Sequence, residues 1–168
     1  CSLANHFNRV YHPFNRNVRE EPVLVIEEWK NVRIAYRRRT GPYGAENKQL
    51  MEDFKAYLRA RGRLDAGAVI MGIALDDPAA TPGRAQRYDV GLVVEPGAEP
   101  VGLPVRSVDG GRYAVFAVAH TAQAVAEFWQ ELPALTVGLP VDRARPVVER
   151  YAAAKVAAHL CEFCVPLQ

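Results

Sequence analysis

Apolar and polar positions in the first half of the chain predict strands around one amphipathic helix. β-branched and aromatic residues predominate from Val23 to Tyr36, which is typical of one long strand interrupted near Trp29. Apolar residues then recur at helical spacing between acidic Glu46 and Gly62, which ends the pattern. This half is therefore expected to form a strand, a helix and two further strands, over residues 23–36, 46–61, 69–75 and 88–94.

The same order of elements returns after a linker rich in Pro and Gly at residues 95–104. Asp109-Gly110-Gly111 is typical of a hairpin turn, and Thr121 is placed to cap a second helix, which Pro133 follows. Two apolar runs close the chain. We expect a strand, a helix and two strands here as well, over residues 112–119, 121–132, 147–152 and 160–167.

The two halves also match residue by residue, which indicates an internal duplication. Each short apolar match alone is what chance would give, but the shared order favours duplication. One βαββ unit buries a single face of its sheet, so two units would join their sheets and leave a groove along a pseudo-twofold axis. We therefore expect an α+β fold of duplicated βαββ units, with antiparallel sheets, helices packed on one face and a central groove. The matched segments are Arg33–Tyr36 with Arg112–Val115, Met51, Phe54 and Leu58 with Val125, Phe128 and Leu132, and Asp89–Val94 with Glu162–Leu167.

Composition excludes several classes of protein. Of the 168 residues, 49% are hydrophobic and 24% are charged, as in ordinary globular proteins, and a net charge of +2 is too small to indicate nucleic-acid binding by itself. No apolar run approaches the roughly 20 residues that cross a bilayer, so we expect no membrane partner. The sequence contains no pattern for a catalytic triad and no Gly-rich phosphate loop, so we expect no cofactor.

The three cysteines, Cys1, Cys161 and Cys164, are too few for a disulfide scaffold. In the predicted last strand, residues three apart point to opposite faces, so Cys161 and Cys164 are expected to be reduced and to bind no metal. Reduced cysteines favour a cytoplasmic location. A basic cluster at Arg33 and Arg37–Arg39 is interpreted as a solvated strand edge rather than a phosphate-binding patch.

Four groups of motifs follow one another along most of the chain. They are Arg39-Thr40-Gly41-Pro42-Tyr43, then Asp76-Asp77-Pro78 with Thr81-Pro82 and Arg87-Tyr88-Asp89, then Gly110-Gly111-Arg112-Tyr113-Ala114-Val115-Phe116, and finally Glu162-Phe163-Cys164-Val165-Pro166. Single motifs are weak signals, but the ordered set, from about Pro22 to Gln168, is fairly specific. This set resembles the GyrI-like small-molecule-binding domain.

The resemblance implies an SHS2-like duplicated fold, with repeat 1 at about residues 22–95 and repeat 2 at about residues 105–168. The family includes effector-binding domains of AraC-type and MerR-type multidrug regulators, gyrase modulators and hydrolases of cyclopropane-bearing toxins. The second repeat departs from the pattern, because His120-Thr121-Ala122 replaces the Gly-Pro-Tyr turn and Ala152–Ala158 replaces the Asp-x-Pro loop. Residues 1–21 are expected to be an arm with little independent structure, or a remnant of a lost DNA-binding region, since residues 2–14 faintly resemble part of an AraC-type DNA-binding domain.

Glu162 is the leading candidate for the polar anchor of the groove. In several family members a glutamate of the last strand faces the ligand, and Glu162 is the acid of an otherwise apolar strand. Alternation puts Glu162 and Cys164 on one face and Cys161, Phe163 and Val165 on the helix side. The alternatives for Glu162 are a solvated sheet face or pairing with an arginine.

Alternation also puts Glu149 and Tyr151 on one face of the neighbouring strand. Carboxylates between aromatic walls suit an organic cation, because the charges attract it and the rings add cation–π contact. Trp129 is a core residue by default, and the resemblance makes it a pocket candidate. Tyr36 and Tyr113 complete the set of candidate ligand-binding residues.

We expect a binding module for a small, moderately apolar organic ligand, cations included, that serves for effector sensing or sequestration. An enzyme is less favoured, since the sequence offers one glutamate as its candidate catalytic residue. A hydrolase of reactive toxins would use Glu162 to activate water. A gyrase-modulating protein is the third alternative. The expected partner is thus a small molecule, with DNA, through a region outside this chain, and DNA gyrase as further candidates.

Overall fold

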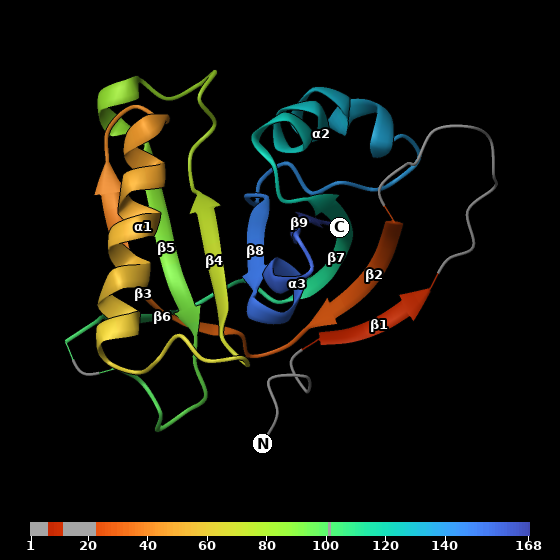
Figure 1. Ribbon diagram of the computed structural model, residues 1–168. Helices are drawn as coiled ribbons and strands as arrows, with labels where there is room; N and C mark the ends of the chain where they lie inside the picture. Colours follow the sequence, from red (N-terminus) through yellow and green to blue (C-terminus); the bar gives the residue numbers. More distant parts are fainter. Residues whose placement is uncertain (1–6, 12–22, 101) are drawn as a thin grey trace.

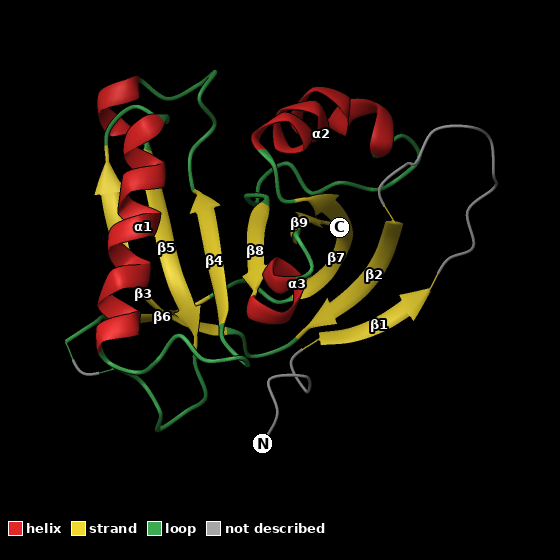
Figure 2. Cartoon of the chain, in the orientation of Figure 1, coloured by secondary structure: helices red, strands yellow, loops and turns green. Residues whose placement is uncertain are grey.

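The computed structural model describes residues 7–11, 23–100 and 102–168. In these ranges the chain forms one nine-stranded antiparallel sheet and three α-helices (Figures 1 and 2). The elements in chain order are β1 (Phe7–Tyr11), β2 (Val23–Trp29), β3 (Arg33–Thr40), α1 (Ala45–Ala60), β4 (Val69–Ala74), the 3-10 helix η2 (Gly83–Ala85), β5 (Arg87–Val93), β6 (Val105–Ser107), β7 (Gly111–Ala119), α2 (Ala122–Leu135), β8 (Val148–Ala152), α3 (Ala153–Ala157) and β9 (Leu160–Pro166).

The order of the strands is β1-β2-β7-β9-β8-β4-β5-β3-β6, so the two halves of the sheet join where β4 pairs with β8. The first strand of each half pairs with a strand of the other half, since β2 pairs with β7 and β6 pairs with β3. Two predictions were therefore wrong. Residues 23–36 are two strands in different halves, separated where Asn31 takes a left-handed φ of 55°, and Asp109–Gly111 links strands that do not pair as a hairpin.

The strand register confirms the internal duplication. Asp89 of β5 lies opposite Ile73 of β4, and Glu162 of β9 lies opposite Arg150 of β8, so Asp89 and Glu162 occupy equivalent positions. One residue earlier on each central strand, Gly72 and Glu149 lie directly opposite each other. The pseudo-twofold axis therefore passes through this pair.

Both long helices pack on the same face of the sheet, one over each half, and Figure 1 shows them on either side of β4 and β8. Under α1, Phe54 and Leu58 are fully buried; under α2, the ring of Phe128 stacks on that of Phe163 with centroids 4.2 Å apart. Burial of side chains of this size stabilises the fold by roughly 1.5–3 kcal/mol each. The predicted helix cap is confirmed, because the Thr121 hydroxyl accepts a hydrogen bond from the backbone N–H of Ala124.

The opposite face of the sheet is also buried and forms an inner core, which includes Trp29 stacked on Tyr113 with ring centroids 3.8 Å apart. The cysteines divide between the two faces as predicted, with Cys161 in the cluster under α2 and Cys164 in the inner core, and both thiols are free. Cys1 lies outside the described residues.

Three further details depart from the predictions. Pro133 lies inside α2, which continues to Leu135. The segment that replaces the Asp-x-Pro loop in the second repeat forms the short helix α3. Phe7–Tyr11 form strand β1 on β2 rather than a segment without structure, while the rest of the predicted arm lies outside the described residues.

A pocket between the two helices

A pocket of about 630 Å³ opens between α1 and α2 over the centre of the sheet. Its floor comes from the neighbouring ends of β4 and β8, and its rim from the loops that follow β4 and precede β8. The charged, polar and aromatic residues of its lining are Tyr43, Asn47, Asp76, Asp77, Thr81, Tyr88, Trp129, Arg143, Arg145 and Glu149. It is therefore the central groove that the duplicated fold predicts, on the helix side of the sheet.

Glu149 is the acid at the floor of this pocket. Its Oε2 accepts a hydrogen bond from the Tyr151 hydroxyl at 2.7 Å and a longer one from the Tyr88 hydroxyl at 3.4 Å. Within the described parts of the chain, no Arg, Lys or His makes an ion pair with it. Burial raises the pKa of the Glu149 carboxyl, and the two tyrosine hydrogen bonds offset part of that rise. A cation that enters the pocket would therefore stabilise the ionised form of this carboxyl.

Aromatic rings form the walls above Glu149. Trp129 is 40% exposed, although its ring contacts Phe128 and Phe163 edge-on at 5.7 and 5.4 Å between centroids. On the opposite wall, the rings of Tyr43 and Tyr88 meet edge-on at 6.5 Å. Exposed ring surface beside a partly buried carboxyl offers a cation both π contact and charge.

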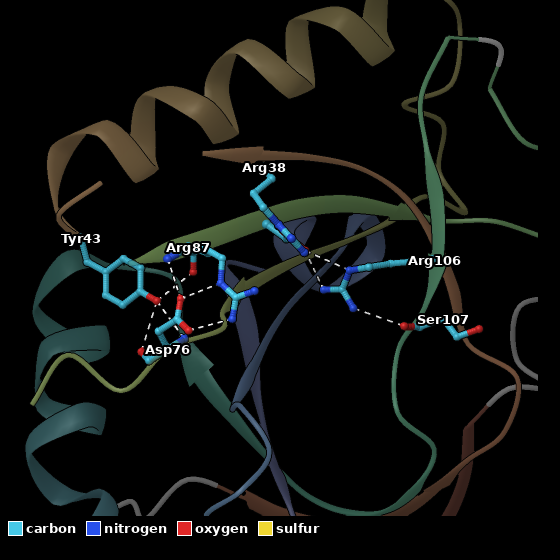
Figure 3. Close-up of polar contacts among 7 residues, drawn as sticks. Arg38, Tyr43, Asp76, Arg87, Arg106 and Ser107 are labelled. Atoms are coloured by element: carbon cyan, nitrogen blue, oxygen red, sulfur yellow. Dashed lines mark hydrogen bonds and ion pairs between the residues drawn. The ribbon is translucent and has the colours of Figure 1, made fainter. Parts of the chain in front are cut away.

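The rim next to Tyr43 is held by polar contacts (Figure 3). The Tyr43 hydroxyl donates to the carbonyl oxygen of Arg87 at 2.8 Å and accepts from the backbone N–H of Asp76 at 3.0 Å. The guanidinium of Arg87 donates twice to the carboxylate of Asp76, at 3.0 and 2.8 Å, and these bonds lower the pKa of Asp76. Asp76 is thus ionised but neutralised by Arg87, so Glu149 carries the acidic character of the pocket floor.

Of the six predicted site residues, Glu149 and Trp129 line this pocket, and Tyr151 is connected to it through its hydrogen bond to Glu149. The other three, Glu162, Tyr36 and Tyr113, lie elsewhere. Tyr113 stacks in the inner core and donates its hydroxyl to the carbonyl oxygen of Asp109 at 2.6 Å. Tyr36 packs against that core beside Arg38 and Arg106.

Glu162 lies on the face opposite the pocket and is paired with an arginine, the alternative that its sequence left open. Both of its carboxylate oxygens accept bonds from Arg150 at 3.0 Å, and Arg150 also donates to both oxygens of Glu27 at 2.7 and 3.0 Å. These three side chains are no more than 6% exposed. The groove anchor that the family resemblance assigned to Glu162 therefore has no contact with the pocket, whereas Glu149 does.

The equivalent acid of the first repeat is bound in the same manner. The fully buried Asp89 accepts bonds from Arg38 at 2.6 and 3.0 Å and from Arg106 at 2.9 Å, two arginines that Figure 3 shows side by side. Both repeats thus place an acid bound by arginine at the same position in the inner core, although the arginines come from positions that are not equivalent. Arg38 of the predicted basic cluster is one of these structural arginines, and Arg39 binds Glu46 and Asn47.

Sequence comparison identifies the family of the chain. The profile of the GyrI-like small-molecule-binding domain matches residues 24–168. The chain belongs to the GyrI-like family. It is 41% identical over 148 residues to the Bacillus subtilis (strain 168) protein named "SPbeta prophage-derived putative transcriptional regulator YosT", a match that covers 86% of this chain and 99% of that protein. The resemblance read from the sequence motifs is thereby confirmed.

Solved structures share the fold at low sequence identity. The C-terminal domain of EcmrR superposes with a TM-score of 0.61 at 10% identity, over 86% of this chain and 96% of that one. SAV2435 bound to tetraphenylphosphonium superposes with a TM-score of 0.57 at 14% identity, over 85% of this chain and 92% of that one.

In residues 7–11, 23–100 and 102–168, no helix has the length and apolar character to cross a bilayer, and no group of three or more His, Cys, Asp or Glu side chains is placed to hold a metal.

Proposed function

We propose that this GyrI-like domain binds a lipophilic organic cation in the pocket between α1 and α2, with Glu149 as the anionic anchor. The observation that carries the proposal is a partly buried carboxyl that faces an aromatic-walled pocket and has no cationic partner among the described residues. Burying an ionised acid without a counter-charge is costly, so such a group is stabilised by a ligand that supplies the charge.

The shape of the pocket supports a ligand of drug size. Its volume of about 630 Å³ lies inside the range of roughly 300–1,000 Å³ that is usual for small-molecule sites. Trp129 on one wall and Tyr43 on the other provide apolar ring surface on both sides of the anchor. A cation with aromatic substituents would satisfy the carboxyl and both walls at once.

The comparisons support an effector-sensing or sequestering role. YosT carries the name of a transcriptional regulator, and SAV2435, which has the same fold, was solved with the lipophilic cation tetraphenylphosphonium. From these relatives, we infer that the domain acts by binding a small molecule. Interactions with DNA or gyrase stay predictions from the family resemblance.

Hydrolysis with Glu162 as the catalytic base is the less favoured alternative. Arg150 binds both oxygens of that carboxylate, so a water molecule would have to displace a buried ion pair to reach it. Arg150 therefore disfavours Glu162 as a catalytic base.

Titration calorimetry of the protein with tetraphenylphosphonium and with neutral triphenylphosphine oxide tests the proposal. We expect the phosphonium to bind at least about tenfold more tightly, the ratio that about 1.4 kcal/mol of charge attraction gives. Equal affinity for the two compounds, or no binding of either, would refute cation recognition by this pocket.

A further inference from the structure

We propose that Gly72 is a positioning residue of the pocket, which keeps free the space that the Tyr88 hydroxyl and the Glu149 carboxyl share. The inference rests on the proposed function of Glu149 and goes beyond it, because it explains why the anchor has the geometry described above. Gly72 itself has no side chain with which to contact a ligand. It would act through Tyr88 and Glu149.

The distances around Gly72 show what a side chain there would meet. A Cβ built on Gly72 would lie 2.3 Å from the Tyr88 hydroxyl oxygen, 3.2 Å from Cζ of the same ring and 3.1 Å from Oε2 of Glu149. The first distance is far inside van der Waals contact, so an alanine would force Tyr88 to move. Tyr88 is 5% exposed and packs under α1, which leaves its ring little room to move.

The backbone does not explain the choice of glycine. Gly72 lies within β4 and is absent from the glycines that have positive φ, so other residues could adopt its conformation. Glycine in the interior of a strand weakens the strand by roughly 0.5–1 kcal/mol relative to alanine, and it often marks a place where another group approaches closely. Here the approaching groups are the two that define the anchor.

Pseudo-symmetry gives an independent reason for a glycine at this point. Gly72 and Glu149 are equivalent positions of the two repeats, and they also face each other across β4 and β8. Two long side chains at this position would therefore meet on the axis. With glycine in the first repeat, the second repeat can place a single carboxyl at the middle of the pocket floor.

Gly72→Ala tests the proposal, with Gly67→Ala as the matched control. Gly67 is exposed just before β4, and its Cβ would make an ordinary 3.5 Å contact with Asp65. Because charge attraction falls with distance, displacement of the carboxyl by Gly72→Ala should weaken tetraphenylphosphonium binding by about tenfold or more. Gly67→Ala should bind the phosphonium like the wild type.

A second variant separates positioning from a general loss of stability. Tyr88→Phe removes the oxygen nearest to the new Cβ, so Gly72→Ala with Tyr88→Phe should bind more tightly than Gly72→Ala alone. If Gly72→Ala does not fold, the double variant should recover a cooperative melting transition. A double variant that is no better than Gly72→Ala in binding or in folding would overturn the proposal.

A measurement without ligand keeps this inference distinct from the proposed function. Carboxyl ¹³C NMR can follow the titration of Glu149 in the free protein. Gly72→Ala should shift its midpoint relative to the wild type and Gly67→Ala should not, whether or not tetraphenylphosphonium binds. An unchanged midpoint in Gly72→Ala refutes the positioning role, while failure of the wild type to bind the cation refutes only the proposed ligand.

Discussion

Replacement of Glu149 by glutamine removes the charge of the proposed anchor and keeps its shape. The amide oxygen can still accept the hydrogen bond that Tyr151 donates at 2.7 Å. Two unit charges about 5 Å apart, at an effective dielectric constant of about 20, attract by about 3 kcal/mol. This attraction limits the loss of affinity for a monovalent cation to about 150-fold.

The expected loss is smaller than this limit, because the raised pKa of Glu149 means that part of the attraction is spent on releasing its proton. We expect Glu149→Gln to bind tetraphenylphosphonium about 10- to 100-fold more weakly in titration calorimetry at pH 8. Binding of triphenylphosphine oxide, which tests the aromatic walls without charge, should change by less than about twofold. An unchanged phosphonium affinity, or an equal loss for both compounds, would show that the carboxylate is not the anchor.

The same variant has a predicted effect on stability. Since burial raises the pKa of Glu149 in the folded state, the folded protein binds the proton more tightly than the unfolded chain does. The contribution of this group is therefore present at low pH and is lost as pH rises through the raised pKa. Glu149→Gln should lack that loss, so above the raised pKa its melting temperature should equal or exceed that of the wild type.

Three further substitutions or conditions test other parts of the account. Glu162→Gln breaks a buried pair with Arg150, so denaturant unfolding should show a free energy of unfolding lower by about 3 kcal/mol. The folded fraction should keep its phosphonium affinity. A stable variant with lost affinity would show that Glu162 belongs to the binding site. Trp129→Ala should weaken phosphonium binding by about 5- to 30-fold through lost cation–π contact, with a small change in melting temperature because the side chain is 40% exposed. Phosphonium affinity should rise as pH increases through the raised pKa of Glu149. Calorimetry in buffers of different ionisation heat should show that binding releases protons. An affinity that does not change with pH would contradict a titrating anchor.

The duplicated fold could be predicted from the sequence because it depends on local periodicity and on order. The helix over Ala45–Ala60 and the equivalence of Asp89 with Glu162 follow from patterns within each repeat. The division of residues 23–36 could not be predicted in the same way. Its two strands form continuous β-type sequence, and their separation depends on pairing with strands far along the chain.

The site was harder to predict, because both faces of the sheet are buried. Alternation grouped Glu162 with Cys164 and Glu149 with Tyr151, but it could not indicate that the two glutamates lie on opposite faces of the sheet or which face carries the pocket. Glu162 is bound by Arg150, from the neighbouring strand β8, and local sequence does not encode that pair. Tyr43 and Tyr88 belong to the family motifs but were not singled out, since their convergence on Glu149 requires the tertiary fold.

A crystal structure of the protein with tetraphenylphosphonium tests the central claim most directly. We expect one phosphonium between α1 and α2, with phenyl rings against Trp129 and Tyr43 and with its phosphorus nearer to the carboxylate of Glu149 than to any other acid. A phosphonium on the opposite face of the sheet beside Glu162, or a pocket that stays empty at saturating ligand, would contradict it.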